Sequence, residues 1–127
     1  MSEAWTPTPR GYRSVSVPGF PNFFTVVGPH SPIGNFSLIE ISELQVGYIL
    51  QLIEAVRCGE CRALAATPEA TDRFNADLRN AVQGTIWMTG CRSWYLDAEG
   101  YPATWPWSVG RFRDEMRAPV WDDFERV

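Results

Sequence analysis

The sequence predicts an α/β fold, in which one buried strand and a long helix are followed by a smaller α+β lobe. A short apolar run at residues 23–27 predicts the strand, and apolar spacing over residues 37–57 predicts the helix. After residue 91 the chain becomes rich in Trp, Tyr and Pro, which favours short strands and turns. We therefore expect one unit at residues 1–58 and a helical, aromatic-rich lobe at residues 59–127.

The predicted strand has the sequence Phe-Phe-Thr-Val-Val and lies between Pro21-Asn22 and Gly28-Pro29. Its apolar residues do not alternate with polar ones, which is typical of a strand covered on both faces, as in a parallel sheet. Residues 1–18 predict an extended arm, because they are rich in Pro, Ser and Thr. The alternation at residues 13–17 is compatible with a short edge strand.

A loop rich in Gly and Pro, residues 28–35, follows at the carboxyl end of the predicted strand, where open α/β sheets bind ligands. A helix then begins near Ser37 and continues to Arg57, with Gly59 after it. Its periodic positions are Leu38, Ile41, Leu44 or Gln45, Tyr48, Ile49, Leu52 and Val56. The first turn offers unpaired N–H groups and the positive end of the helix dipole, so we expect it to bind an anionic or electron-rich ligand edge.

A second helix is predicted to begin at Thr67 and Pro68. Thr is a good N-cap, and Pro is favoured at the first helical position. Apolar residues four apart at Phe74, Leu78 and Val82 indicate the face of this helix that packs inward.

The lobe after residue 91 is predicted to contain two short strands, residues 93–96 and 101–104. A turn at residues 97–100 joins them, and its final Gly suits a positive φ. Residues 108–116 predict a short helix, and residues 117–127 predict an irregular tail.

Composition limits the classes of function. The chain has 127 residues, of which 45% are hydrophobic and 20% charged, as in a globular protein with a real core. Its net charge of -4, without a cluster of basic residues, argues against a nucleic-acid partner. No apolar run approaches the ~20 residues of a membrane-spanning helix, and the first residues lack the apolar core of a secretory signal. We therefore expect a cytoplasmic location and no membrane partner.

The pair Cys58 and Cys61 has the spacing of a metal or redox motif. A zinc site needs two further ligands, and only Cys91 and His30 remain, on separate predicted elements. A redox pair usually opens a helix, whereas this pair follows the end of one. We interpret it as a helix-terminating turn and predict no metal site. His30, the only histidine, has no nucleophile motif beside it, so we predict no catalytic residue either.

Three short motifs follow one another along the chain. Gly-Phe-Pro-Asn-Phe-Phe at residues 19–24 precedes Gly-Pro-x-Ser-Pro at residues 28–32, Ile-x-Glu-x-Gln lies at residues 41–45, and Ser-Trp-Tyr lies at residues 93–95. In this order and spacing, from about Tyr12 to Phe124, the chain resembles the C-terminal part of FAD- and NADPH-dependent flavin monooxygenases, above all the Baeyer–Villiger enzymes and the related flavin-containing monooxygenases.

The resemblance implies that residues 1–58 are the last strand, loop and helix of a Rossmann-type FAD-binding domain. It also implies an oxidoreductase that uses FAD and NADP to insert one oxygen atom from O2 into a ketone or heteroatom of a small-molecule substrate. The implied cofactor contacts are Pro29, His30, Asn35, Phe36, Ser37 and Leu38. The implied substrate-pocket residues are Ile33, Gly34 and Trp94.

One part of the family's pattern does not occur in the sequence. There is no GxGxxG, the motif that binds the pyrophosphate of FAD or NADPH. We therefore expect the chain to be inactive alone and to work with missing N-terminal FAD and NADPH domains, or with an oligomer mate. The alternative is a non-catalytic binding or interaction module derived from such an enzyme. For Trp94, Trp105 and Trp107, aromatic core packing is the alternative to a role in the cleft.

Overall fold

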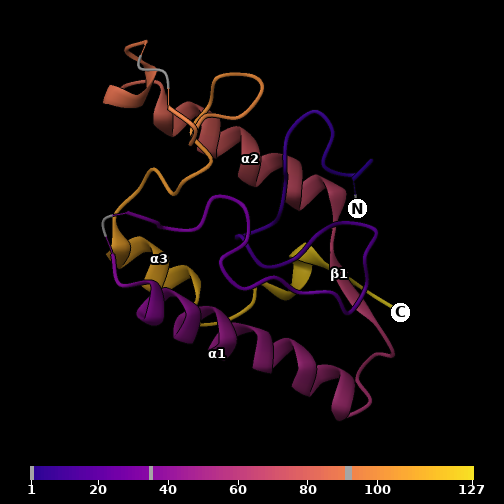
Figure 1. The fold of residues 1–127 in the computed structure, drawn as a ribbon. Helices are drawn as coiled ribbons and strands as arrows, with labels where there is room; N and C mark the ends of the chain where they lie inside the picture. The colour runs from indigo at the N-terminus through magenta and orange to yellow at the C-terminus, as the bar shows by residue number, and fades with distance from the viewer. Residues whose placement is uncertain (1, 35, 91–92) are drawn as a thin grey trace.

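The longest element of the computed structural model is a helix that forms one edge of the molecule (Figure 1). The structure describes residues 2–34, 36–90 and 93–127. Within them the chain forms α1 (Leu38–Arg57), β1 (Leu64–Ala66), α2 (Pro68–Val82), the 3₁₀ turn η1 (Ile86–Met88), α3 (Val109–Glu115), the 3₁₀ turn η2 (Trp121–Asp123) and β2 (Phe124–Arg126). The result is a small mixed helix and strand fold with a two-stranded sheet.

Each α-helix begins at a hydroxyl side chain that caps it. Ser37 Oγ accepts a hydrogen bond from the N–H of Glu40, at 3.4 Å, at the start of α1. Thr67 Oγ1 and Ser108 Oγ accept similar bonds at the starts of α2 and α3, at 3.1 and 3.2 Å. These caps satisfy N–H groups that have no partner within the helix. The three helices predicted from the sequence are therefore confirmed.

The predicted strand at residues 23–27 is wrong. Phe24 forms only an isolated bridge with Ser16, and the backbone at Val27 has φ +55°. The side chains of Phe23 and Val26 are 40% and 45% exposed, so they are not covered on both faces. A left-handed residue at the end of the run turns the chain away from an extended path. The run is thus a loop from which Phe24 packs against the core.

The only sheet in the described part of the chain joins β1 and β2, which pair antiparallel with Ala66 opposite Phe124. All three residues of β1 are buried. The sheet continues past β2, because the N–H of Val127 donates to the carbonyl of Ala63 at 2.9 Å. The prediction of an irregular tail at residues 117–127 was therefore wrong for its last residues.

The predicted strands at residues 93–96 and 101–104 form a hairpin-like return rather than a ladder. Leu96 and Pro102 make one isolated bridge, and the N–H of Ala103 donates to the carbonyl of Tyr95 at 2.9 Å. Gly100 has φ +83°, as the turn prediction required. The edge strand suggested at residues 13–17 also reduces to isolated bridges, because Arg13 and Ser14 have positive φ.

The core is built from aromatic rings that meet from distant parts of the chain. The ring of Tyr12 lies 5.9 Å from that of Phe74 and 5.7 Å from that of Phe124, both edge-on. Trp105 packs edge-on against Phe112, with ring centroids 5.1 Å apart. Such contacts add to the burial of large apolar surfaces. The core thus draws side chains from both predicted units, and the division at residue 58 stays a prediction about a larger protein.

The Cys58–Cys61 segment is the helix-terminating turn that the sequence predicted. Cys58 caps α1, and Gly59 follows at φ +79°. Both thiols are free, and Cys58 Sγ donates to Glu54 Oε1 at 3.2 Å. That hydrogen bond raises the pKa of the Cys58 thiol. Among the described residues, no helix combines the length and apolarity needed to cross a membrane.

Candidate functional site

The loop between residues 27 and 34 is fixed to α1 by the buried side chain of Gln45. The N–H of Val27 donates to Gln45 Oε1 at 2.7 Å, and Gln45 Nε2 donates to Ser31 Oγ at 2.9 Å. Ser31 Oγ in turn donates to the carbonyl of Gly28 at 2.8 Å. A buried amide with its donors and acceptors satisfied holds the surrounding backbone in one arrangement. The loop is thereby positioned over the helix.

Unusual backbone conformations give this loop its shape. Val27, His30 and Gly34 have φ of +55°, +66° and +91°. Such values are costly for residues with a side chain, and most of all for a β-branched one, so the surrounding contacts must impose them. Gly28 has no room for a side chain, because a Cβ would lie 2.2 Å from the carbonyl oxygen of Ser14.

The loop leads into the first turn of α1, where backbone donors are free. The N–H groups of Ser37 and Leu38 donate no hydrogen bond to any residue that the structure describes. The side-chain oxygen of Ser37 accepts the N–H of Glu40 instead. The side chain of Leu38 is half exposed. Two N–H groups at the positive end of a long helix form a site suited to an electron-rich acceptor.

Beside this turn lies a cavity of about 120 Å³ whose walls are about equally polar and apolar. Its lining comes from the loop, from the hairpin-like return and from the core: Pro32, Ile33, Gly34, Phe36, Tyr95, Thr104 and Trp105. The cavity therefore brings together three of the predicted site residues, Ile33, Gly34 and Phe36.

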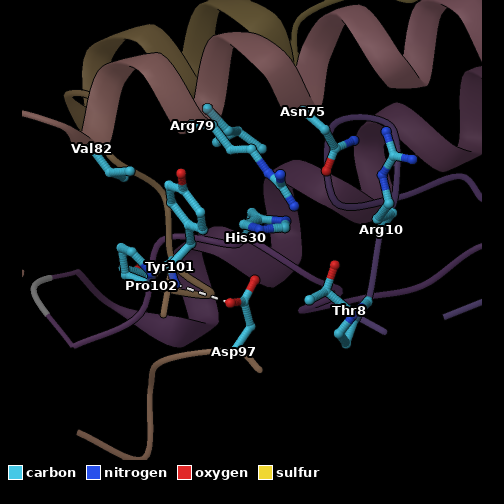
Figure 2. Close-up of a pocket in the computed structure, with 12 residues that line it drawn as sticks. Thr8, Arg10, His30, Asn75, Arg79, Val82, Asp97, Tyr101 and Pro102 are labelled. Carbon is cyan, nitrogen blue, oxygen red and sulfur yellow. Dashed lines mark hydrogen bonds between the residues drawn. The ribbon is translucent and has the colours of Figure 1, made fainter. Parts of the chain in front are cut away.

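His30 points into a different and much smaller cavity, of about 20 Å³, with room for one water molecule (Figure 2). In Figure 2 its ring lies among the side chains of Arg79, Asp97 and Tyr101. Nδ1 of His30 is buried without a hydrogen-bond partner in the described part of the chain. Burial lowers the pKa of His30, and the carboxylate of Asp97 offsets part of that effect. A neutral imidazole is the result.

The remaining predicted residues lie apart from the 120 Å³ cavity. Trp94 is 89% exposed, and its ring centroid lies 4.9 Å from that of Tyr95, which does line the cavity. Pro29 is partly buried in the loop and lines neither cavity. Asn35 lies outside the described residues. For Trp105 the core-packing alternative is correct, although one side of its ring also faces the cavity.

Sequence reasoning missed four residues that line the cavity, and the anchor that holds the loop. Pro32 and Tyr95 stood inside the motifs quoted above, so their positions carried a signal. Thr104 and Trp105 did not, since only folding brings the segment after the turn against the loop. Gln45 stood in the Ile-x-Glu-x-Gln motif, yet nothing in the sequence showed that its amide faces the loop.

Comparison with known proteins relates the chain to flavin-dependent oxygenases. An uncharacterized monooxygenase of Mycobacterium tuberculosis is 42% identical over 113 residues, which is 89% of this chain and 23% of that protein. A Baeyer–Villiger monooxygenase of Streptomyces coelicolor is 37% identical over 120 residues, 92% of this chain and 23% of its own length. An FAD-binding monooxygenase of Emericella nidulans is 32% identical over 127 residues, 98% of this chain and 21% of its own.

Solved structures give the same relationship. A steroid monooxygenase bound to NADP superposes with a TM-score of 0.88 and 27% identity, over 99% of this chain and 25% of that one. The cyclohexanone monooxygenase of Rhodococcus sp. Phi1, bound to NADP+, gives a TM-score of 0.81 at 27% identity, over 98% of this chain and 24% of its own. No family model matches the chain.

The matches cover nearly all of this chain but less than a quarter of the curated relatives. Sequence and fold agree, because the solved structures are monooxygenases too. The chain is therefore related, over almost its whole length, to one part of the FAD-binding, Baeyer–Villiger-type monooxygenases.

Proposed function

We propose that this chain forms one wall of the flavin and substrate site of a flavin-dependent monooxygenase. The complete enzyme would use FAD and NADPH to insert one oxygen atom from O2 into a ketone or heteroatom of a small-molecule substrate. The proposal rests on two N–H groups at the start of α1 that have no partner among the described residues, next to a cavity, in a chain 37% identical to part of a Baeyer–Villiger enzyme.

The start of α1 fits the pyrimidine edge of a flavin. That edge carries acceptor oxygen and nitrogen atoms and gains negative charge on reduction, and helix N-termini stabilise such charge. Ser37 and Leu38 would donate their N–H groups to it. Phe36, Pro29, His30 and Asn35 stay predicted cofactor contacts, and for His30 the supporting feature is only its place in the loop.

FAD, when bound, would supply the oxygen-transfer chemistry, and the residues of this chain would control its surroundings. Ile33, Gly34 and Phe36 would line the substrate side, because they share the 120 Å³ cavity with Trp105. Excluding water there strengthens the hydrogen bonds from α1 to the cofactor. Trp94 stays a predicted contact, which would require its exposed ring to be covered by another part of the enzyme.

The phosphates of FAD and NADPH would be held elsewhere, because the sequence has no GxGxxG. The relatives have more than three quarters of their length outside the matched segment. We place this chain at the C-terminal end of such an enzyme and interpret residues 1–58 as a remnant of its Rossmann-type FAD-binding domain. This assignment rests on the motifs and not on the strand at residues 23–27, which does not form.

Replacing Leu38 by Pro tests whether the start of α1 binds the flavin. The variant is made in a chimera, in which this chain replaces the matching segment of the Streptomyces coelicolor enzyme. Leu38 is the first residue of α1, a position that tolerates Pro, and Ser37 already has the extended ψ of 118° that a following Pro prefers. One charge-assisted hydrogen bond, ~1.5–3 kcal/mol, would be lost mainly from the reduced flavin. We expect the reduction potential to fall by roughly 30–60 mV, since ~1.4 kcal/mol corresponds to ~30 mV for two electrons.

Leu38→Ala is the matched control, because it removes the same side chain but keeps the N–H group. Its potential should stay at that of the unmodified chimera in a redox titration. A Leu38→Pro chimera that binds FAD with an unchanged potential would show that α1 does not seat the flavin.

A further inference from the structure

Helix α1 has apolar side chains on two opposite sides. At 3.6 residues per turn, Ile41, Tyr48 and Leu52 fall on the side that packs into the core. The other side, here called the outer face, carries Leu38, Ile39, Val46, Leu50 and Ile53, all of them exposed. In Figure 1, α1 runs along the margin of the molecule. Surface helices normally have one apolar stripe, and a helix that is apolar on opposite sides is normally buried.

The outer face also contains a groove. It is shallow, and the residues that line it are Leu38, Ile39, Ser42, Glu43, Val46, Gly47 and Leu50. A Cβ at Gly47 would have nothing within 4 Å, so no contact with the described residues requires glycine there. Glycine in the middle of a helix is unfavourable, but it lets another backbone approach closely. The position of Gly47 therefore indicates a close neighbour outside the described residues.

The relatives indicate what that neighbour is. This chain aligns over 92% of its length with the Streptomyces coelicolor enzyme, yet it spans only 23% of that enzyme. More than three quarters of such an enzyme must therefore be accommodated around the chain. The outer face is the side of α1 that the core does not use, and it begins at Leu38, the residue proposed to contact the flavin.

We propose that the outer face of α1 is the surface on which the remaining, cofactor-binding part of the monooxygenase docks. The partner surface is apolar and comes close to the backbone of α1 at Gly47. Glu43 is the only charged residue among those that line the groove, so apolar burial dominates this contact. The inference rests on the proposed function, because that function supplies the partner.

Thiol labelling tests the docking surface without using activity. Val46→Cys places a thiol in the groove, where the side chain is 43% exposed, and Ile86→Cys is the control, since Ile86 is 78% exposed and does not line the groove. Both variants are treated with iodoacetamide as the free chain and as the chimera with the Streptomyces coelicolor enzyme, and each site is read by peptide mass spectrometry. Chimeras are first selected for protection of the buried Cys61, which reports correct folding.

In the free chain, the thiols at positions 46 and 86 should both react. In the chimera, the thiol at position 46 should react at least tenfold more slowly, and the thiol at position 86 should not change. Leu50→Cys should repeat the result for position 46.

Three outcomes would overturn the inference. Fast reaction at positions 46 and 50 in a chimera with protected Cys61 would mean that the face stays open. Slow reaction in the free chain that depends on its concentration would assign the face to a second copy. Protection of the free chain by phosphatidylglycerol vesicles would assign it to a membrane. Protection in the chimera with no change of potential in Leu38→Pro would instead refute only the proposed function.

Discussion

His30 is partly buried, with its Nδ1 shielded from solvent, and this gives the chain a specific dependence on pH. Its pKa is lowered by burial, so between that lowered value and the ordinary value near 6.5 the unfolded chain binds a proton that the folded chain does not. The free energy of unfolding should therefore be highest above pH 6.5 and fall as the pH drops from 7.5 to 5.5. Through this one group, the unfolded chain binds at most one proton more than the folded chain. Urea denaturation at several pH values measures it.

The control for this prediction is His30→Asn. Asn tolerates the φ of +66° better than other residues with side chains, and it does not titrate. Because His30 is the only histidine, this variant should lose most of the decrease between pH 7.5 and 5.5. If both proteins lost stability equally over this range, the buried imidazole would not be the cause.

Single residues also explain why the strand predicted at residues 23–27 does not form. Apolarity alone assigned residues 23–27 to a sheet, but the N–H of Val27 is taken by the side chain of Gln45, eighteen positions along the chain. A side chain that replaces a strand partner cannot be seen from local pattern. The backbone of Val27 also has a positive φ, which its β-branched side chain disfavours in isolation.

At the scale of the element, Gly47 should have opposite effects in the free chain and in the enzyme. Gly47→Ala adds a methyl group to open space in the interior of α1. Helix propensity then predicts that the free energy of unfolding of the free chain rises by ~0.5–1 kcal/mol. In the chimera with the Streptomyces coelicolor enzyme, this gain should disappear or become a loss, because the methyl group meets the docked surface.

Urea denaturation of both proteins, with and without the substitution, measures the two effects. Equal stabilisation in the free chain and in the chimera would show that nothing approaches the backbone at Gly47.

Helices were predictable from this sequence, and strands were not. Local signals start each helix, namely Ser37, Thr67 with Pro68, and Ser108, and the structure confirms all three. The strands are three residues long, and one of them consists of Leu-Ala-Ala. Their pairing depends on partners far apart in the sequence, so neither composition nor alternation identified them.

At the scale of the whole molecule, we predict that the chain alone does not oxidise NADPH. The sequence has no GxGxxG, so neither FAD nor NADPH has its phosphate-binding loop here. In a steady-state assay with FAD, NADPH and a panel of ketones, NADPH consumption should equal that of free flavin. The chimera with the Streptomyces coelicolor enzyme is the positive control. Turnover by the chain alone clearly above free flavin would contradict the prediction.

The candidate site was predictable only in part, for a reason that also lies at this scale. Ile33, Gly34 and Phe36 follow one another along the loop, so a resemblance in sequence could place them together. Tyr95 and Trp105 reach the same cavity only because the chain returns past the turn at residues 97–100. Such convergence is a property of the folded chain.

The pairing of β1 with β2 bears on how the protein is made. Leu64 finds its partner at Arg126, about half the chain further on, and such distant contacts are slow to form. During synthesis, β1 leaves the ribosome with its edge unpaired and must wait for the final residues of the sequence to emerge. The sheet therefore closes only after β2 has emerged. Until then, α1 can form, but Phe124 is not yet available to pair with Ala66 or to pack against the ring of Tyr12.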